Sequence, residues 1–374
     1  MKGHRSGPFQ GGSSVRVVLF CGDESPYGRA HLLPVLRGTF SVQAVVVPTP
    51  ACWQRFRARL MGTGVPPPQR VRGRAILQSL LRRARAALVG GGAGQPNPWN
   101  TLDATFPKSQ VREVCAERGV PFREITDVNT PEVLGWMAKQ GPDLLLCAAY
   151  PQIFGSALLA TARLGAVNFH PSLLPRCRGA NPIYWAIASG EKETGVSAHF
   201  MTQEVDAGDL VEQIPIPIAE EDDYWSLYRK ALREIPHLVE AVEAFFAESR
   251  TRGIPQDPRE ATSFREPRQL HRRLMWGSRS AAALVRQVRA GEAFFITQGR
   301  WIGVRRAALV PTDPILTNDL QVPAGTVIAI RDGELVVAVE GGGVAIREAV
   351  YRGRTMIGST LAACLPLQIG EILS

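Results

Sequence analysis

Four short, nearly continuous apolar runs constrain the fold of this chain more than any other feature. They are Val15–Phe20, Val42–Val47, Leu144–Cys147 and Ala166–His170. A strand that is covered on both faces is apolar along its whole length, so such runs predict buried strands of a parallel sheet. Segments with helical periodicity alternate with these runs, namely Ala30–Leu36, Pro107–Arg118 and Asp223–Glu248. This alternation predicts an α/β fold with a parallel sheet over residues 14–250.

The chain changes character after residue 250. Residues 251–266 are polar and rich in Pro, Arg and Glu, which is typical of a linker, and residues 269–290 have room for one or two short helices. Short apolar runs separated by Gly and Pro follow: Ala293–Thr297, Trp301–Arg305, Gly325–Ile330, Leu335–Val339 and Val344–Glu348. The Arg331-Asp332-Gly333 segment between two of them favours a hairpin. We therefore expect a linker over residues 251–289 and a small antiparallel β-barrel over residues 290–374.

The basic residues of this chain are unevenly placed. The formal net charge of the 374 residues is +9, and from Ser25 to Leu102 there is no Asp or Glu but there are eleven arginines. Within this segment, residues 48–102 are too long for a simple connection between strands, so we expect a basic insertion. Its apolar residues between Ile76 and Leu88 follow helical spacing, and arginines that include Arg82 and Arg83 lie among them. A local basic surface of this kind predicts a polyanionic partner.

Several classes of protein do not match this composition. No apolar run approaches the ~20 residues of a membrane-spanning helix, and the first fourteen residues lack the apolar core of a secretory signal. The six cysteines are scattered, with no CxxC pair and no His at ligand spacing, so neither a disulfide scaffold nor a metal site is expected. The sequence predicts a cytoplasmic protein that needs neither a membrane nor a metal, and it indicates no protein partner.

The candidate site lies where one apolar run ends. Asn168 and His170 are two residues apart, so in a strand their side chains share a face. Pro171 directly follows and cannot continue a central ladder, which places His170 at the carboxyl end of its strand. Asp206 follows another predicted strand, Val196–Met201, after a short loop. Because open α/β sheets bind ligands at the carboxyl ends of their strands, we expect these three side chains to converge.

An amide, an imidazole and a carboxylate together suit acyl transfer. His170 and Asn168 can each donate a hydrogen bond to a developing oxyanion, and Asp206 can orient the imidazole and keep it protonated. No GxSxG elbow carries a nucleophile, so we expect direct attack by an external nucleophile. If water were that nucleophile, the same residues would make a hydrolase. His199 is expected only to pack within its strand.

The joint spacing of four motifs resembles the formyltransferase superfamily that uses 10-formyltetrahydrofolate. The motifs are Asn168-x-His170, SLLPRCRG at Ser172–Gly179, GEKETGVSAHFM at Gly190–Met201 and Asp206-Ala-Gly-Asp-Leu210. The order of the domains is similar to that of the methionyl-tRNA formyltransferases. The resemblance implies a Rossmann-like N-terminal formyltransferase domain, a small C-terminal β-barrel, and 10-formyltetrahydrofolate as co-substrate.

The resemblance also implies roles for individual residues. The catalytic residues would be Asn168, His170 and Asp206. The folate would lie along Ala149, Tyr150, Ile153, Val205 and Asp206. The acceptor side would be lined by Ser172, Leu173, Leu174, Arg176 and Arg178. A tRNA acceptor would also be held by the Arg-rich insertion, including Arg82 and Arg83.

The sequence leaves the acceptor open. The segment Asn181-Pro-x-x-Trp185 resembles formyltransferases that act on small amines such as amino sugars. The Pro-Trp-Pro-Gly stretch of the tRNA enzymes is replaced by a segment beginning Arg289-Ala-Gly-Glu. Methionyl-tRNA is the first expectation, and an amino-sugar nucleotide or a biosynthetic amino acid is the second. Alternatives from other classes are a non-catalytic RNA-binding protein on this fold and a protein whose basic helix lies on an anionic membrane.

Overall fold

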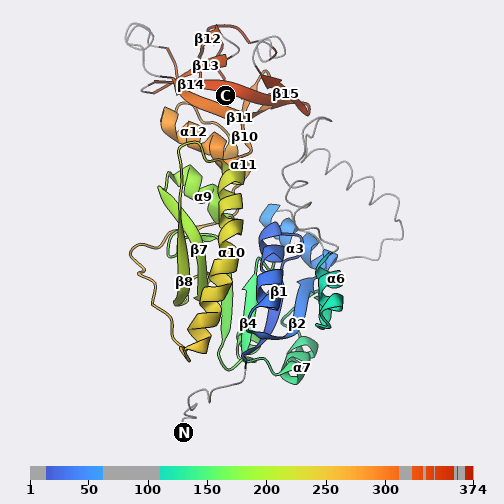
Figure 1. Cartoon of the computed structure of the whole chain (residues 1–374). Coiled ribbons are helices and arrows are strands. Elements are labelled where there is room, and N and C mark those ends of the chain that lie inside the picture. Colours follow the sequence, from blue (N-terminus) through green and yellow to red (C-terminus); the bar gives the residue numbers. More distant parts are fainter. Residues whose placement is uncertain are drawn as a thin grey trace, which may run out of the picture.

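The protein is built on two sheets that lie at opposite ends of the molecule (Figure 1). The structure, a computed structural model, describes residues 14–61, 110–310, 322–331, 334–340, 342–357, 360 and 367–373. The first sheet has seven strands and the second has six. In the described part of the chain, no helix is both long and apolar enough to cross a membrane.

The N-terminal sheet has the strand order β3-β2-β1-β4-β5-β7-β8. Its strands are β1 (Arg16–Cys21), β2 (Ser41–Pro48), β3 (Phe122–Ile125), β4 (Leu144–Ala148), β5 (Ala166–His170), β7 (Glu193–Phe200) and β8 (Leu210–Pro217). The ladders from β3 to β5 are parallel, whereas β5, β7 and β8 pair antiparallel. The predicted α/β fold is confirmed. Strands β7 and β8 pair antiparallel because a short loop, residues 201–209, joins them directly without a crossover helix.

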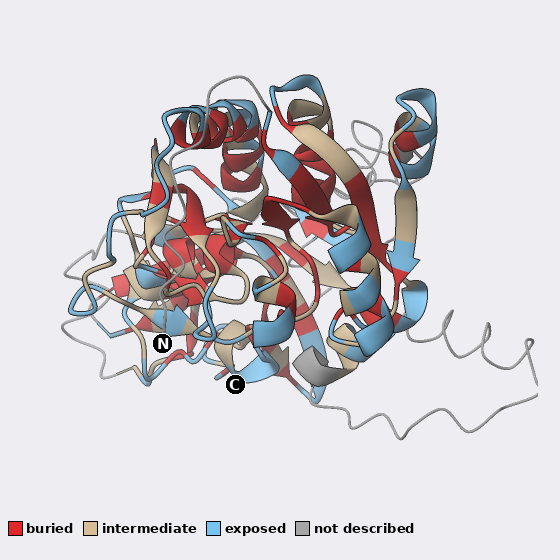
Figure 2. Ribbon diagram, turned by 90° about the horizontal axis from the view of Figure 1, so that it is seen from below, coloured by how far each residue is buried: buried red, intermediate tan, exposed pale blue. Residues whose placement is uncertain are grey.

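Helices cover both faces of this sheet. They are α1 (Pro26–Ala30), α2 (Leu32–Arg37), α3 (Pro50–Met61), α6 (Gln110–Glu117), α7 (Pro131–Gln140), α8 (Ser156–Leu159), α9 (Pro182–Ser189) and α10 (Tyr224–Ala247). Alternate residues of β1 enter different cores, since Val17 and Leu19 join the cluster with α10 whereas Val18 and Phe20 join the cluster with α7 and α8. Figure 2 shows the buried strands between helices whose outer faces are exposed.

The residues of helix α10 themselves specify where the helix begins and which face is buried. The Asp223 carboxylate accepts from the main-chain N of Ser226 at 2.8 Å, and Ser226 Oγ accepts from the main-chain N of Asp223 at 3.0 Å. This reciprocal capping box begins the helix. Its apolar residues, including Leu227, Ile235 and Val242, recur on one face and are buried against the sheet. The predicted helix over residues 223–248 is thus confirmed.

The C-terminal sheet has the order β10-β11-β14-β13-β12, with β15 paired to β14. Its strands are β10 (Ala293–Thr297), β11 (Arg300–Val310), β12 (Val327–Arg331), β13 (Glu334–Val339), β14 (Gly342–Tyr351) and β15 (Arg354–Ile357). Every one of these ladders is antiparallel, and the sheet has its own apolar core. The antiparallel C-terminal unit is confirmed. Its closure into a barrel stays a prediction, because the ladders among the described residues form an open path from β10 to β12.

The segment between the sheets is structured. The two-residue strand β9 (Ser263–Phe264) pairs with β6 (Arg178–Gly179) of the N-terminal half. The predicted short helices follow as α11 (Gln269–Arg272) and α12 (Ala281–Ala290). Helix α12 contacts both α9 and β11 (Figure 1). Residues 251–289 therefore form part of the packed structure and are more than a connection.

Most of the Arg-rich insertion lies outside the described residues. Helix α3 occupies its first part, and its residues Cys52 and Trp53 are buried. The helix expected around Ile76–Leu88, with Arg82 and Arg83, lies outside the described ranges.

His31, at the junction of α1 and α2, is a buried base whose protonation opposes folding. Its Nδ1 donates to the Tyr27 carbonyl oxygen at 2.8 Å, and its ring packs on Phe169 with the ring centroids 4.4 Å apart. Its Nε2 is buried without a hydrogen-bond partner among the described residues. Burial lowers the pKa of His31 to about 4, although the hydrogen bond to Tyr27 acts in the opposite direction.

We expect the stability of the protein to fall as the pH drops from 6.5 to 4. The unfolded chain protonates His31 near pH 6.5 and the folded protein only near pH 4, so the stabilisation is complete above pH 6.5 and is lost below it. The loss amounts to about 3 kcal/mol in the free energy of unfolding. Denaturant unfolding across this range should show it, and His31→Asn, which keeps a donor but does not titrate, should remove most of it. The exposed control His237→Asn should behave like the unaltered protein. An unchanged pH dependence in His31→Asn would contradict this explanation.

Candidate active site

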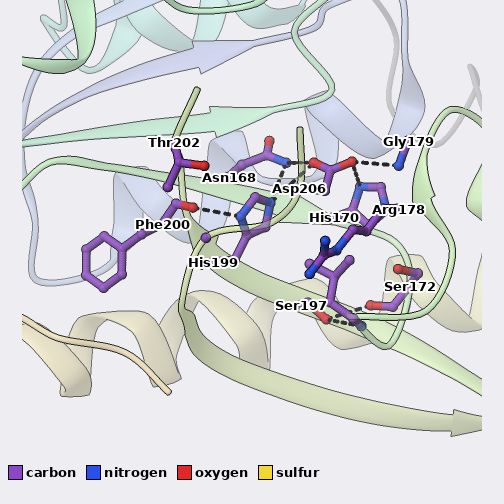
Figure 3. A network of polar contacts seen from close by, with 12 residues as sticks. Asn168, His170, Ser172, Arg178, Gly179, Ser197, His199, Phe200, Thr202 and Asp206 are labelled. Atoms are coloured by element: carbon purple, nitrogen blue, oxygen red, sulfur yellow. Dashed lines mark hydrogen bonds and ion pairs between the residues drawn. The ribbon is translucent and has the colours of Figure 1, made fainter. Parts of the chain in front are cut away.

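The site forms at the carboxyl end of β5, beside β7 and the loop that follows β7. Strand β5 ends at His170, as Pro171 predicts, and Asn168 and His170 both point toward the loop that carries Asp206 (Figure 3). Phe169 lies between them in sequence and enters the core on the opposite face. The three predicted residues are therefore brought together.

The Asp206 carboxylate is the centre of the polar network. Its Oδ2 accepts from the main-chain N of Gly179 at 2.8 Å and lies 3.6 Å from His170 Nδ1. Its Oδ1 lies 3.4 Å from both Asn168 Nδ2 and His199 Nε2. Burial alone would raise the pKa of Asp206, but His170, His199 and the Gly179 amide lower it by more, so this pKa lies well below its ordinary value. The buried carboxylate is ionised at neutral pH.

His199 belongs to this network, and the expectation that it only packs within its strand is wrong. Its Nε2 lies 3.1 Å from Asn168 Nδ2, and its Nδ1 donates to the carbonyl oxygen of Phe200 at 2.9 Å. Because a carbonyl oxygen only accepts, Nδ1 carries a proton, while Nε2 faces both the Asn168 amide and the Asp206 carboxylate. Asn168 and His199 are direct neighbours in the ladder between β5 and β7. Knowledge of that strand pairing would have placed His199 on the same face as Asn168.

One ring nitrogen of His170 is hydrogen-bonded, and the other faces the Asp206 carboxylate. Its Nε2 donates to the carbonyl oxygen of Cys177 at 3.0 Å, while its Nδ1 faces Asp206. The imidazole is buried, with 7% of the side chain exposed. A proton on either nitrogen therefore faces an oxygen acceptor. At 3.6 Å the contact between Nδ1 and Asp206 is too long for a hydrogen bond, so a proton on Nδ1 can be donated to negative charge developing beside it.

The loops around the site hold strained backbone. Four non-glycine residues have positive φ angles there: Ala149 (50°), Cys177 (56°), Asn181 (54°) and Asp206 (53°). Such a conformation is uncommon for residues with a side chain, and it persists only where surrounding contacts enforce it. These residues follow β4, β5 and β7, three adjacent strands of the sheet. The strain therefore supports this edge of the sheet as the functional site.

Three of the predicted acceptor residues line one cavity. Ser172, Leu173 and Arg176 border a cavity of about 330 Å³ together with residues 190–194. The guanidinium of Arg176 is paired with the Glu191 carboxylate at 2.5 Å. The loop from Ser172 to Gly179 borders this cavity and also reaches the Asp206 network, where the main-chain N of Gly179 donates to Asp206 Oδ2.

The other two predicted acceptor residues have different surroundings. Leu174 is buried, and its main-chain N donates to Ser197 Oγ at 3.2 Å. Gln213 donates to the Leu174 carbonyl oxygen at 2.8 Å, which fixes the loop to β8. Arg178 is also buried, and its guanidinium donates to Gln256 Oε1 at 3.0 and 2.7 Å. The structure thus gives Arg178 a partner within the chain.

The predicted folate residues follow β4 and β7, the two strands that flank β5. Ala149 and Tyr150 directly follow β4, and Tyr150 is buried with its ring centroid 5.4 Å from that of Phe20. Ile153 and Val205 are large apolar side chains that remain 68% and 53% exposed. Exposed apolar side chains beside a buried polar network are suited to a ligand with an aromatic ring and polar groups.

A wall of the site comes from residues 254–264, which we call the strap. At one end, Ile254 and Leu210 exchange main-chain hydrogen bonds of 2.7 and 2.8 Å. Toward the other end, the Thr262 carbonyl oxygen accepts from the main-chain N of Arg178 at 2.8 Å. The strap and Gln256 within it were not predicted as part of the site, because their partners lie far away along the sequence.

Comparisons with known proteins agree with this geometry. The formyl transferase family model matches residues 76–242. The methionyl-tRNA formyltransferase of Sorangium cellulosum (strain So ce56) is 34% identical over 307 residues, which cover 79% of this chain and 95% of that protein. That of Thiobacillus denitrificans (strain ATCC 25259 / T1) is 32% identical over 273 residues, which cover 71% and 85%.

A solved structure shows the same fold. WlaRD, described as a sugar 3N-formyl transferase in the presence of dTDP and 5-N-formyl-THF, superimposes with a TM-score of 0.55 over 90% of this chain and 98% of that chain. Its sequence is 12% identical, so this likeness concerns the fold alone. These two relatives are 32% and 34% identical to this chain and are covered over 85% and 95% of their length, and the family model agrees with them. This chain is therefore an enzyme that belongs to the formyl transferase family.

Proposed function

We propose that this enzyme transfers the formyl group of 10-formyltetrahydrofolate to the amino group of methionyl-tRNA. The observation that carries the chemistry is the convergence of Asn168, His170 and His199 on the buried, ionised carboxylate of Asp206. This network contains donors for an oxyanion and an ionised carboxylate that orients them.

In the proposed reaction, the amine nitrogen of the acceptor attacks the formyl carbon. A new carbon–nitrogen bond forms, the bond from that carbon to the folate nitrogen breaks, and the amine proton is finally transferred to that nitrogen. Asn168 and His170 donate to the formyl oxygen as it gains negative charge. The contact of 3.4 Å between Asn168 and Asp206 is long, so the amide can turn toward the substrate. Asp206 orients His170 from 3.6 Å, and the amine proton passes through water to the folate nitrogen.

An arginine cluster beside the site supports a polyanionic acceptor. Arg265 and Arg268 are exposed immediately after the strap. Partial burial lowers the pKa of His271, and the nearby guanidinium groups of Arg279, Arg268 and Arg272 lower it further, as a positive local potential does. Such a surface suits the phosphates of a nucleic acid. The relatives that match over most of their length are also named methionyl-tRNA formyltransferases.

The two residues that favour a small amine in the sequence have partners within this chain. The Trp185 ring stacks on Phe264 of the strap, with centroids 4.5 Å apart and planes 10° apart, and its Nε1 donates to the Arg265 carbonyl oxygen at 2.9 Å. Asn181 Nδ2 donates to Glu266 at 3.3 Å. These contacts explain both residues as packing against residues 264–266, which makes tRNA the better supported acceptor.

An acceptor screen tests the proposal. Consumption of 10-formyltetrahydrofolate is followed with charged initiator tRNA, with a panel of amino-sugar nucleotides and amino acids, and without an acceptor. We expect methionyl-tRNA to be formylated fastest. Faster transfer to a small amine than to methionyl-tRNA would identify that amine as the acceptor. Donor loss that is equally fast with and without an acceptor would indicate a hydrolase. No donor consumption under any condition would reject the proposed activity in favour of a non-catalytic RNA-binding protein.

A further inference from the structure

We propose that Gln256 is a positioning residue of this enzyme, which holds the loop of Asp206 in its strained conformation and joins it to Arg178. This inference rests on the proposed function of Asp206. Gln256 belongs to the strap, in the segment whose composition predicts only a linker.

The carboxamide of Gln256 bridges two loops of the site. Its Nε2 donates to the carbonyl oxygens of Asp206 at 2.9 Å and of Gly208 at 2.7 Å. Its Oε1 accepts from Arg178 Nε at 3.0 Å and from a terminal nitrogen of the same guanidinium at 2.7 Å. A single side chain therefore ties the loop after β7 to the loop after β5. Figure 3 shows Arg178 and Gly179 next to Asp206, on the far side of the carboxylate from His199.

Asp206 needs an external clamp because of its backbone conformation. Its φ angle is +53°, a region that costs a residue with a side chain of order 1 kcal/mol or more. Without restraint, the loop would relax toward an extended conformation and carry the carboxylate away from His170. The two bonds from Gln256 fix the carbonyl oxygens of residues 206 and 208, so they restrain the peptide units 206–207 and 208–209.

The strap in turn is anchored to both loops by its main chain. Ile254 pairs with Leu210, which begins β8 directly after the Asp206 loop. Thr262 accepts at Oγ1 from the main-chain N of Cys177 at 2.8 Å, and its carbonyl oxygen accepts from the main-chain N of Arg178. Gln256 lies between these anchors, so its side chain is held in place on both sides.

The hydrogen-bonding capacity of Gln256 is fully used. A carboxamide offers two N–H donors and two lone pairs, and all four are occupied by this chain. No capacity remains to bind a substrate, which distinguishes positioning from catalysis. Loss of Gln256 should therefore affect kcat, through the placement of Asp206, and should leave the KM for the acceptor nearly unchanged.

Two substitutions of Gln256 distinguish its bonds to the Asp206 loop from its bonds to Arg178. Gln256→Met keeps the length of the side chain and removes all four hydrogen bonds. Gln256→Glu keeps the acceptor for Arg178 but places a carboxylate against the carbonyl oxygens of Asp206 and Gly208. The control is Arg259→Ala, a strap residue whose guanidinium is exposed and bonds to Asp257. For each variant we measure thermal unfolding and steady-state kinetics. The kinetics use the acceptor to which the unaltered enzyme transfers formyl groups fastest.

We expect both Gln256 variants to lose roughly ten- to a hundred-fold in kcat, with KM within about twofold of the unaltered enzyme. Arg259→Ala should behave like the unaltered enzyme. Full activity in Gln256→Met, or in Gln256→Glu, would overturn the clamp, and so would a loss confined to KM. As a second measurement, a crystal structure of Gln256→Met should show Asp206 displaced from its positive φ angle; an unmoved loop would overturn the inference even if activity fell. Failure of the unaltered enzyme to transfer formyl groups would instead reject the proposed function.

Discussion

Asn168→Ala and His170→Ala should each lower kcat for formyl transfer roughly a hundred- to a thousand-fold, which corresponds to about 3–4 kcal/mol of lost transition-state stabilisation. Each side chain lies against Asp206 at the carboxyl end of β5 and can donate to the formyl oxygen. The loss should fall on kcat and not on KM, because the negative charge on that oxygen develops only in the transition state. Single-turnover kinetics with saturating donor and acceptor measure the effect directly.

The control for these variants is His237→Ala, since His237 is exposed on α10 and pairs with Glu234. It should retain the kinetics of the unaltered enzyme. Thermal unfolding of all three variants separates a catalytic loss from a loss of structure. If either site variant kept near-normal transfer with its fold intact, the proposed roles of Asn168 and His170 would be wrong.

Replacing Arg265, Arg268 and Arg279 together with Ala should weaken tRNA binding and flatten its salt dependence. Each phosphate contact contributes about 0.7–0.9 to the slope of log affinity against log salt concentration. Loss of three contacts should therefore reduce that slope by about 2–3, with at least roughly tenfold weaker binding at low salt. Equilibrium binding of tRNA at several salt concentrations measures both quantities.

The matched control is Arg112→Ala, which removes an exposed arginine of α6 whose guanidinium bonds to the Glu124 carboxylate at 2.8 Å. The same measurement on Arg82→Ala and Arg83→Ala tests the basic insertion separately. An unchanged slope in the triple variant would show that Arg265, Arg268 and Arg279 do not contact the tRNA. An unchanged slope in all of these variants would argue against tRNA as the acceptor.

Much of the fold was predictable because its signals are local. Strand β5 coincides with the predicted run Ala166–His170, since a doubly covered strand is apolar throughout and Pro171 ends it. Helix α10 shows its own cap at Asp223 and its own apolar periodicity. The convergence of Asn168, His170 and Asp206 also followed from the sequence, because strand ends of one sheet meet at one edge.

The remainder was not predictable from local sequence. The strap has a polar composition, yet it packs closely, because its contacts to the loop after β5 are made largely by main-chain atoms that every residue possesses. Composition therefore suggested a linker. His199 was assigned to packing because its role depends on which residue faces it across the ladder.

The sequence by itself determined the α/β framework, the antiparallel C-terminal strands and the chemical groups at the carboxyl end of β5. Only the tertiary structure decided how Asp206 is held: ionised, strained, flanked by His199 and clamped by Gln256. The physical reason is that residues distant in the chain determine how deeply Asp206 is buried and which charges act on its carboxylate. They also determine which side chain lies opposite Asn168 across the ladder. The local pattern of apolar and polar residues does not indicate which distant residues will be in contact.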